Sequence, residues 1–333
     1  MTAVMPESLD TSRTMVEPAV RAVLDRLDPE TKQVAGYQLG YWDETGRPGS
    51  LGGKAMRGAF ALLSARAAGA PAERGLPGAV AVELVHNFSL LHDDVMDRDT
   101  ERRHRPTAWT VFGTSAAILA GDVLLSTAAE VLGESDEPQW AVRCLLAATR
   151  RLIAGQAADL KFEERDDVGL DECVAMARDK TASLLSCATS IGAVLAAAPA
   201  SLTMGLAAYG DHLGLAFQLV DDLLGIWGDP AATGKPVGSD LLSRKKSLPV
   251  VAALTAGNAS ADELRELYRE PIAEADVPHA AELVAAAGGR DWAETEASRQ
   301  LDLALSRLDA LDLPEDVLRE LTELAHFVTG RDR

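Results

Sequence analysis

The residues best suited to chemistry form an acidic and basic segment about a third of the way along the chain. Asp93 and Asp97 are four positions apart, which on a helix places both carboxylates on one face. Two such carboxylates repel each other unless a cation lies between them, and Mg²⁺ suits spaced acidic oxygens with room for water and substrate phosphates. Arg102 and Arg103 follow where this helix should end. Acid, metal and basic groups together indicate a site for a diphosphate.

A second acidic pair, Asp221 and Asp222, lies inside the apolar run from Phe217 to Ile226. An acidic run is usually a solvated surface, but ionised carboxylates within an apolar run need a partner or a metal. Two acidic helices that face each other across a bundle can hold a metal cluster that one helix cannot. The sequence therefore predicts that the two acidic segments lie on facing helices.

Helices are expected to carry both segments. Apolar residues before Asp93 recur near the 3.6-residue helical period, and long helical patterns cover about 139–161 and 201–228. No β-alternation, hairpin signal or glycine-rich βαβ fingerprint is found in the sequence. We predict one all-α domain over residues 14–333, preceded by a disordered N-terminus over residues 1–13.

Two interruptions are expected within this helical domain. Gly121-Asp122 separates two short helical patterns, one near 107–117 and the other near 122–132. Residues 228–247 are rich in Gly, Pro and Lys, which predicts a mobile loop.

The composition fits a helical protein that handles anions through metals and local basic clusters. Hydrophobic residues make up 47% of the chain and aromatic residues 5%, and the many Ala and Leu residues favour helices. The formal net charge of −19 argues against nucleic-acid binding, because phosphate backbones need a basic surface.

The cysteines and the apolar runs indicate the compartment. The three cysteines show no metal-ligand spacing, which is typical of reduced thiols in a cytosolic protein. The acidic and polar start, Met1 to Arg13, is unlike a signal peptide. No apolar run reaches the roughly 18 to 20 residues that span a bilayer. We expect a cytoplasmic protein that is not membrane-integral.

With these motifs in order, the sequence resembles the trans-isoprenyl diphosphate synthases, the polyprenyl synthetase family. The resemblance covers roughly residues 45–255. The matching motifs are Gly52-Gly53-Lys54-Ala55-Met56-Arg57, His92-Asp93-Asp94-Val95-Met96-Asp97 with Arg102-Arg103 and Pro106-Thr107, Gly121-Asp122, Lys180-Thr181, Phe217-Gln218-Leu219-Val220-Asp221-Asp222, Gly234-Lys235-Pro236, and Asp240 through Lys245 to Pro249.

This resemblance implies a fold and an activity. The fold is a helical bundle with a central cavity for diphosphate and metal, in a homodimer. The activity is the Mg²⁺-dependent, head-to-tail condensation of isopentenyl diphosphate with an allylic diphosphate (dimethylallyl, geranyl or farnesyl). The metals and fixed cations stabilise the charge that develops on the departing diphosphate.

The resemblance also implies roles for individual residues. Asp93 and Asp97 would bind two Mg²⁺ and Asp221 a third, with Asp94, Asp222 and Asp229 behind these ligands. The residues that would contact the allylic diphosphate are Arg102, Lys180, Thr181, Gln218, Lys235 and Lys245. Those that would hold isopentenyl diphosphate are Lys54, Arg57, His86 and Arg103.

Two positions depart from the family pattern. The second acidic motif usually ends in a third aspartate, but Gly225 stands there, and Asp229 could substitute for it through water. His104 replaces a customary glycine after the first acidic motif.

The residues just before the first acidic motif bear on product length, which in this family depends on the bulk below that motif. Phe88, five positions before Asp93, is large, and Ser89 is small. This combination resembles geranylgeranyl diphosphate (C20) synthases, with farnesyl diphosphate (C15) as the alternative product. Phe88 could instead be an ordinary core residue. Products of C30 and above are disfavoured.

Two other classes of protein remain as alternatives. A class I terpene cyclase shares the fold but lacks the isopentenyl site, so Lys54, Arg57 and Arg103 count against it. A non-catalytic subunit of a heteromeric synthase usually loses aspartates of the first motif, and here all three are present.

Overall fold

The chain is helical in a computed structural model that describes residues 6–49, 56–102, 104–229 and 237–330. Its residues cluster into two compact units, each assembled from separate stretches of chain. The first unit comprises Met1–Thr149, Leu184–Gly210 and Arg307–Leu324, and the second comprises Arg150–Ser183, Asp211–Ser306 and Ala325–Arg333. The all-α class is confirmed, and the single domain over residues 14–333 stays a prediction.

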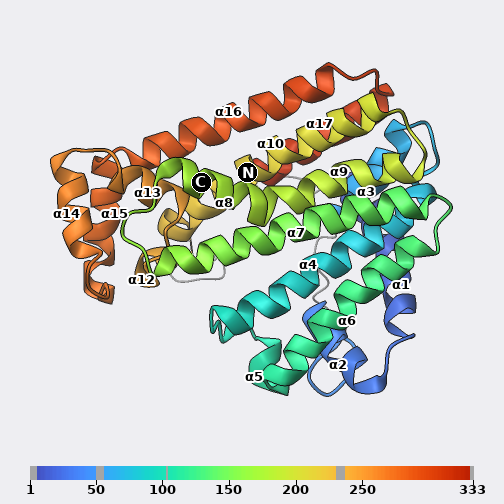
Figure 1. The fold of residues 1–333 in the computed structure, drawn as a ribbon, viewed down its shortest axis with the longest axis horizontal. Helices are drawn as coiled ribbons and strands as arrows, with labels where there is room; N and C mark the ends of the chain where they lie inside the picture. The colour runs from blue at the N-terminus through green and yellow to red at the C-terminus, as the bar shows by residue number, and fades with distance from the viewer. Residues whose placement is uncertain (1–5, 50–55, 103, 230–236, 331–333) are drawn as a thin grey trace. The chain divides into compact units, whose positions relative to one another are not determined.

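The first unit is built around the long helices α4 and α6, which pack against each other (Figure 1). Its elements are α1 (Glu7–Leu24), α2 (Pro29–Gln38), α3 (Met56–Ala67), the 3₁₀ turn η1 (Ala72–Gly75), α4 (Leu76–Met96), β1 (Glu101–Arg102), β2 (Arg105–Pro106), α5 (Ala108–Phe112), α6 (Thr114–Gly133), the start of α7 (Pro138–Glu163), most of α9 (Ser183–Leu195), the start of α10 (Ala200–Trp227) and most of α17 (Glu315–Thr329).

The N-terminal helices show how local sequence starts and stops these elements. Helix α1 begins at Glu7, so the expected disorder over residues 1–13 is wrong for Glu7–Arg13, which are helical because Leu9 and Val16 bury their side chains. Asp28 then caps α2: its carboxylate accepts hydrogen bonds from the backbone N–H groups of Glu30 and Thr31, and Pro29 occupies the first turn. Residues 1–5 lie outside the described residues.

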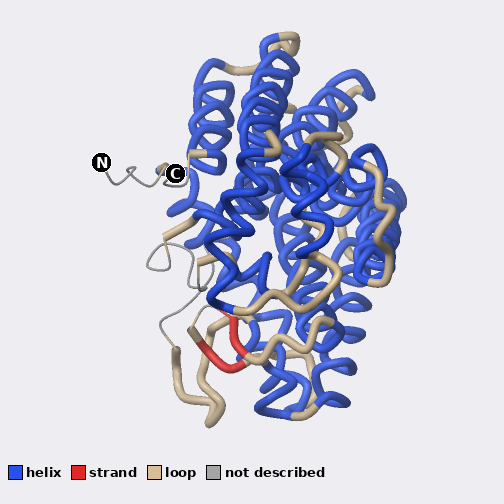
Figure 2. Tube along the Cα trace, turned by 90° about the vertical axis from the view of Figure 1, so that its left-hand side faces the viewer, coloured by secondary structure: helices blue, strands red, loops and turns tan. Residues whose placement is uncertain are grey.

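A short hairpin follows α4, where the sequence predicts no strand. Strands β1 and β2 pair antiparallel, with Arg102 opposite Arg105, and are drawn in red in Figure 2. Two-residue strands are too short to show an alternating pattern, which is why the sequence carries no signal for this hairpin.

Helix α6 is continuous, whereas the sequence predicts a break at Gly121-Asp122. A glycine costs a helix only about 1 kcal/mol, which the packing of α6 on α4 offsets. By length and composition α6 is the one helix of the described chain that could cross a membrane, and 39% of its most apolar window is buried inside the protein. Ile118 and Leu119 on α6 are exposed.

The second unit packs shorter helices around the C-terminal part of α10. Its elements are the end of α7, α8 (Leu170–Ala177), the π-helical turn η2 (Arg178–Ala182), the rest of α10, α12 (Ser239–Leu242), α13 (Leu248–Leu254), α14 (Ala259–Leu267), the 3₁₀ turn η3 (Glu274–Asp276), α15 (Val277–Ala286), most of α16 (Gly289–Asp309) and the end of α17.

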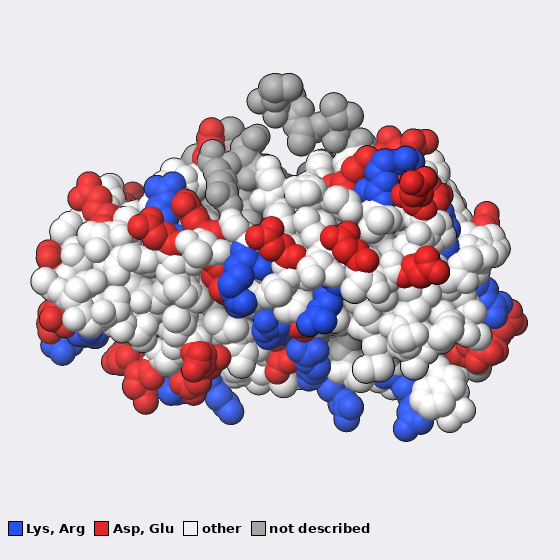
Figure 3. Space-filling view, turned by 90° about the horizontal axis from the view of Figure 1, so that it is seen from above, with Lys and Arg blue, Asp and Glu red and all other residues white. Residues whose placement is uncertain are grey.

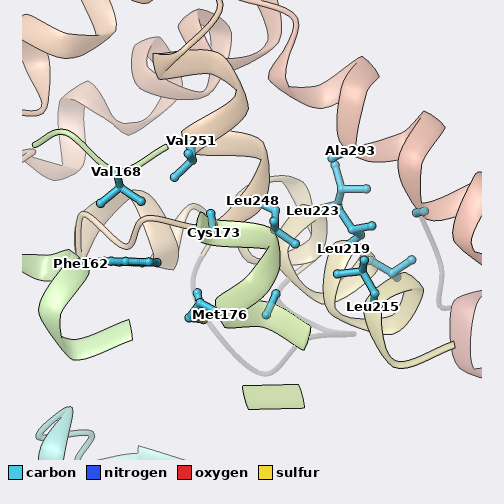
Figure 4. Close-up of a cluster of buried hydrophobic side chains, with 13 residues drawn as sticks. Phe162, Val168, Cys173, Met176, Leu215, Leu219, Leu223, Leu248, Val251 and Ala293 are labelled. Atoms are coloured by element: carbon cyan, nitrogen blue, oxygen red, sulfur yellow. The ribbon is translucent and has the colours of Figure 1, made fainter. Parts of the chain in front are cut away.

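One buried cluster fixes α10 within this unit. Leu215, Leu219 and Leu223 recur every four residues along α10 and pack against side chains from α7, α8, α13 and α16, among them Phe162 and Leu248 (Figure 4). This apolar face sets the rotation of α10, and therefore the direction of the polar residues on its other faces. Helix α12 also gives structure to part of the loop that the sequence predicts over residues 228–247.

Candidate functional site

The first acidic motif lies at the C-terminal end of α4. The backbone N–H of Asp97 donates to the carbonyl oxygen of Asp93 at 2.8 Å, which confirms the one-turn spacing that the sequence predicts. Asp93 is half-buried and Asp97 exposed. A helix C-terminus carries partial negative charge, so carboxylates there are destabilised unless a cation is near. This placement favours metal binding.

The middle aspartate of this motif is paired with an arginine. Asp94 is 1% exposed, and Arg102 Nε donates to Asp94 Oδ1 at 2.6 Å. Burial raises the pKa of Asp94, and the charge of Arg102 opposes that rise. The second oxygen, Oδ2, has no hydrogen-bond partner among the described residues. Asp94 therefore holds the Arg102 guanidinium in place, and its expected position behind the metal ligands stays a prediction.

The segment after α4 is fixed by hydrogen bonds to the backbone of Asp99. The hydroxyl of Thr107 and the indole N–H of Trp109 both donate to the Asp99 carbonyl oxygen, each at 2.7 Å. His104 in the hairpin turn has φ of +59°, in the left-handed region that favours glycine. The histidine thus adopts the backbone conformation that the family's customary glycine permits. Arg103 lies outside the described residues.

The residues expected to influence product length are both buried. Phe88 is 5% exposed and Ser89 7%. The Phe88 ring meets the His92 ring edge-on, with 4.8 Å between the ring centroids. His92 Nε2 in turn lies 3.0 Å from the carbonyl oxygen of Ile118 on α6. His92 therefore links the Phe88 ring to the backbone of α6.

Two of the four residues expected at the isopentenyl diphosphate lie on neighbouring helices. Arg57 is in the first turn of α3, and His86 is on α4, which packs against α3. Both side chains are half-buried. A cation in the first turn of a helix meets the positive end of its dipole, so an anion there is favoured. Lys54 lies outside the described residues, as Arg103 does.

The second acidic motif in α10 contains one exposed and one buried aspartate. Asp221 is exposed, whereas the side chain of Asp222 is 4% exposed. Both oxygens of Asp222 are occupied: Gln218 Nε2 donates to Oδ1 at 2.8 Å, and the backbone N–H of Leu248 donates to Oδ2 at 2.9 Å. Asp221 is therefore accessible to a cation, whereas the oxygens of Asp222 are taken up by the protein; the roles expected for both residues stay predictions.

The buried carboxylate of Asp222 also fixes the position of the Lys245 side chain. Lys245 Nζ lies 3.5 Å from Asp222 Oδ1, and the Lys245 side chain remains 35% exposed, so a ligand can reach it. Burial raises the pKa of Asp222 to about 6, against the opposing charge of Lys245 and the two hydrogen bonds. Nearby carboxylates, Asp240 first and Asp222 next, raise the pKa of Lys245. Lys245 is therefore a protonated cation.

Lys180 and Thr181 lie in the π-helical turn η2, a kind of irregularity common at functional sites. Thr181 Oγ1 donates to Gln218 Oε1 at 2.5 Å, and Lys180 Nζ lies 2.5 Å from Asp159 Oδ2. The turn sits close against α7, since a Cβ at Gly155 would lie 2.2 Å from the backbone nitrogen of Lys180. Thr181, Gln218, Asp222 and Lys245 thus form one connected group.

Two acidic residues beside this group, Asp159 and Asp240, were given no role from the sequence. Asp159 pairs with Lys180, and Asp240 lies 3.8 Å from Lys245 Nζ. The spacing of Gln156 and Asp159 near the end of one helix was a signal for the first, and the position of Asp240 in a matched motif was a signal for the second. Asp229 is exposed beyond the end of α10, and Lys235 lies outside the described residues.

The donor groups fit Mg²⁺ at each acidic segment taken by itself. The described residues contain no cluster of three His, Cys, Asp or Glu side chains placed to hold a metal ion. Mg²⁺ does not require such a cluster, because it keeps several waters and uses one or two carboxylates with substrate phosphates. The accessible carboxylates Asp93, Asp97 and Asp221 suit that mode, whereas the occupied oxygens of Asp222 do not.

Comparisons with known proteins agree on one family. The model of the polyprenyl synthetase family matches residues 48–284. The chain is 48% identical over 331 residues to a (2E,6E)-farnesyl diphosphate synthase of Mycobacterium tuberculosis, covering 97% of this chain and 92% of that one. It is 43% identical to a geranylgeranyl diphosphate synthase of the same organism, covering 92% and 90%. A polyprenyl synthetase structure from Streptomyces coelicolor superimposes with a TM-score of 0.92 at 52% identity, covering 96% and 98%.

Replacing Gly155 with alanine should disturb the π-helical turn. The new Cβ would meet backbone atoms of Lys180 at 2.2 and 2.6 Å, so the turn must shift and the hydrogen bond from Thr181 to Gln218 should break. We expect the affinity for inorganic diphosphate in excess Mg²⁺, measured by calorimetry, to fall about tenfold, or about 1.4 kcal/mol.

The matched control is Gly169→Ala, where the nearest atom to the new Cβ is 3.7 Å away. This variant should bind diphosphate as the parent protein does. Unchanged affinity in Gly155→Ala would show that the turn tolerates displacement.

Proposed function

The chain belongs to the polyprenyl synthetase family, and on this premise we propose that it condenses isopentenyl diphosphate head to tail with an allylic diphosphate to give geranylgeranyl diphosphate. At the level that its relatives share, the chain is a short-chain prenyl diphosphate synthase and therefore a prenyltransferase. The observation that carries the proposal is the connected group of Thr181, Gln218, Asp222 and Lys245, which brings together a hydroxyl from η2 and a lysine from the turn before α13, both in one unit.

The metals are proposed to be Mg²⁺, two bound by Asp93 and Asp97 and a third by Asp221. When bound, they would neutralise the charge that develops on the leaving diphosphate. Asp94 keeps Arg102 directed, and the position of Asp93 at a helix C-terminus favours cation binding.

The basic residues are proposed to divide between the two substrates. Lys180, Thr181, Gln218 and Lys245, with Arg102 and Lys235, would bind the allylic diphosphate, where fixed cations act most strongly in the transition state. Arg57 and His86, with Lys54 and Arg103, would bind the diphosphate of isopentenyl diphosphate. An apolar pocket must exclude water from the allylic cation, and the departing diphosphate can accept the final proton.

Product length is the finer part of the proposal. Phe88 is buried and in contact with His92, and its bulk favours a short product; Ser89, one turn before Asp93, adds little bulk beside it. We propose C20 as the main product. The 48% identity to a farnesyl diphosphate synthase favours C15 as the second candidate.

Incubation with radiolabelled isopentenyl diphosphate, Mg²⁺ and each allylic primer, followed by sizing of the dephosphorylated products, tests this function. We expect elongation to C20 and loss of all product on chelation by EDTA. No elongation with dimethylallyl, geranyl or farnesyl diphosphate would contradict the synthase, and a cyclic hydrocarbon from the allylic substrate alone would indicate a terpene cyclase.

The variant Phe88→Ala should lengthen the product. Removing the ring opens the space below Asp93, so chromatography of the alcohols should show products beyond the parent length. An unchanged length distribution would return Phe88 to the role of a core residue. The ratio of products, rather than the rate, is the measurement, so a modest loss of stability does not obscure it.

We further propose a cytoplasmic homodimer that binds no nucleic acid and is not membrane-integral. The exposed apolar residues Ile118 and Leu119 on α6, and Leu146 on α7, would be covered by a second copy of the chain. Figure 3 shows acidic side chains interspersed with basic ones over one face, in keeping with the net charge of −19.

Protein purified without detergent should show twice the 35.2 kDa chain mass by light scattering; a monomer, or a need for detergent, would contradict this.

A further inference from the structure

The glycine in the second acidic motif has a neighbour that explains it. A Cβ added at Gly225 would lie 2.4 Å from Asp240 Oδ2 and 2.6 Å from Asp240 Cγ. Real Cβ atoms do not approach other heavy atoms within 3.0 Å. The carboxylate of Asp240 therefore occupies the space into which a side chain at position 225 would extend.

Asp240 is held in this place by its own backbone. It lies in α12, is 8% exposed, and its neighbour Leu241 is fully buried. Its carbonyl oxygen accepts a hydrogen bond from the backbone N–H of Lys245 at 2.9 Å and from Ser243 Oγ at 3.3 Å. The same short turn thus fixes Asp240 and brings Lys245 back beside it.

The side chains of Asp240 and Asp222 flank the Lys245 ammonium. Nζ lies 3.8 Å from Asp240 Oδ2 and 3.5 Å from Asp222 Oδ1. The side chain of Asp222 is buried, with 4% of it exposed, and both of its oxygens accept hydrogen bonds. Without Asp240, the ammonium would keep Asp222 as its nearest carboxylate, so the position of Nζ should change. Asp240 is therefore one of two buried carboxylates that flank the Lys245 ammonium.

We propose that Gly225 and Asp240 form a functional pair: the missing side chain at position 225 admits Asp240, and Asp240 positions Lys245 for the diphosphate. The proposal rests on the proposed function, in which Lys245 binds the allylic diphosphate. In this proposal the carboxylate of Asp240, and not that of Asp229, fills the space of the third aspartate of this motif. Asp240 lies against position 225, whereas Asp229 is exposed beyond the helix end. Asp240 is a positioning residue, since it acts through Lys245.

Exchanging the two residues tests the shared space. Gly225→Asp alone should lower the midpoint of urea unfolding, because two carboxylates then compete for one place. The double variant Gly225→Asp/Asp240→Gly should recover most of that loss. The control Gly225→Asp/Asp229→Gly removes a carboxylate of the same region and should not recover it. Equal recovery in the two double variants, or none in either, would overturn the pairing.

Binding of inorganic diphosphate, measured by calorimetry at saturating Mg²⁺, tests the positioning of Lys245. Asp240→Gly should weaken binding about tenfold, and the exchange double variant should return it to within about threefold of the parent. Affinity equal to or tighter than the parent in Asp240→Gly would overturn the positioning role.

A direct metal role for Asp240 gives a different result from a positioning role. In that case the deficit of Asp240→Gly should shrink as Mg²⁺ is raised, whereas the positioning role predicts a deficit that stays constant. A deficit that disappears with Mg²⁺ would overturn the proposal. Failure of the parent protein to elongate any primer would refute the proposed function instead, and the unfolding comparison would still report on the pair.

Discussion

The carboxylate of Asp222 is buried with both oxygens hydrogen-bonded, and the polar groups of the second unit are arranged around it. A buried charge is costly unless it is paired and fully hydrogen-bonded. Asp222 meets this requirement with a side chain one turn away on α10, a backbone N–H at the start of α13, and a lysine from the turn before α13. Removing any of these partners leaves a charge in the core, so the groups that a ligand meets are held by the same interactions that stabilise the unit.

The site also requires close packing of neighbouring groups against two glycine residues, Gly155 and Gly225. The turn that carries Lys180 and Thr181 rests on α7 at a residue without a side chain, and Asp240 rests on α10 in the same way. A methyl group at Gly155 would displace the backbone of Lys180, and one at Gly225 would displace the carboxylate of Asp240. The absence of a side chain is therefore as specific a requirement here as the presence of a carboxylate elsewhere.

Sequence periodicity predicted the long helices and the spacing of Asp93 and Asp97, because both depend on neighbours within one or two turns. It also showed that Asp222 needs a partner. It did not identify the backbone N–H of Leu248 as that partner, since the two are 26 positions apart and meet only through the fold. The π-helical turn has no composition signal, and the hairpin turn at His104 uses a histidine where a sequence pattern would require glycine. Both were missed for these reasons.

The pairing of the basic residues has a consequence for selectivity in the cell. Arg102, Lys180 and Lys245 each lie beside an acidic residue of the protein itself, so none presents an uncompensated charge. A small anion such as inorganic phosphate or chloride that approaches one of these cations must compete with a carboxylate that is already in place. A magnesium-bearing diphosphate offers several anionic oxygens and brings its own counter-charge for the carboxylates it displaces. If these residues bind the diphosphate as proposed, the pairing would disfavour simple anions relative to a magnesium-bearing diphosphate.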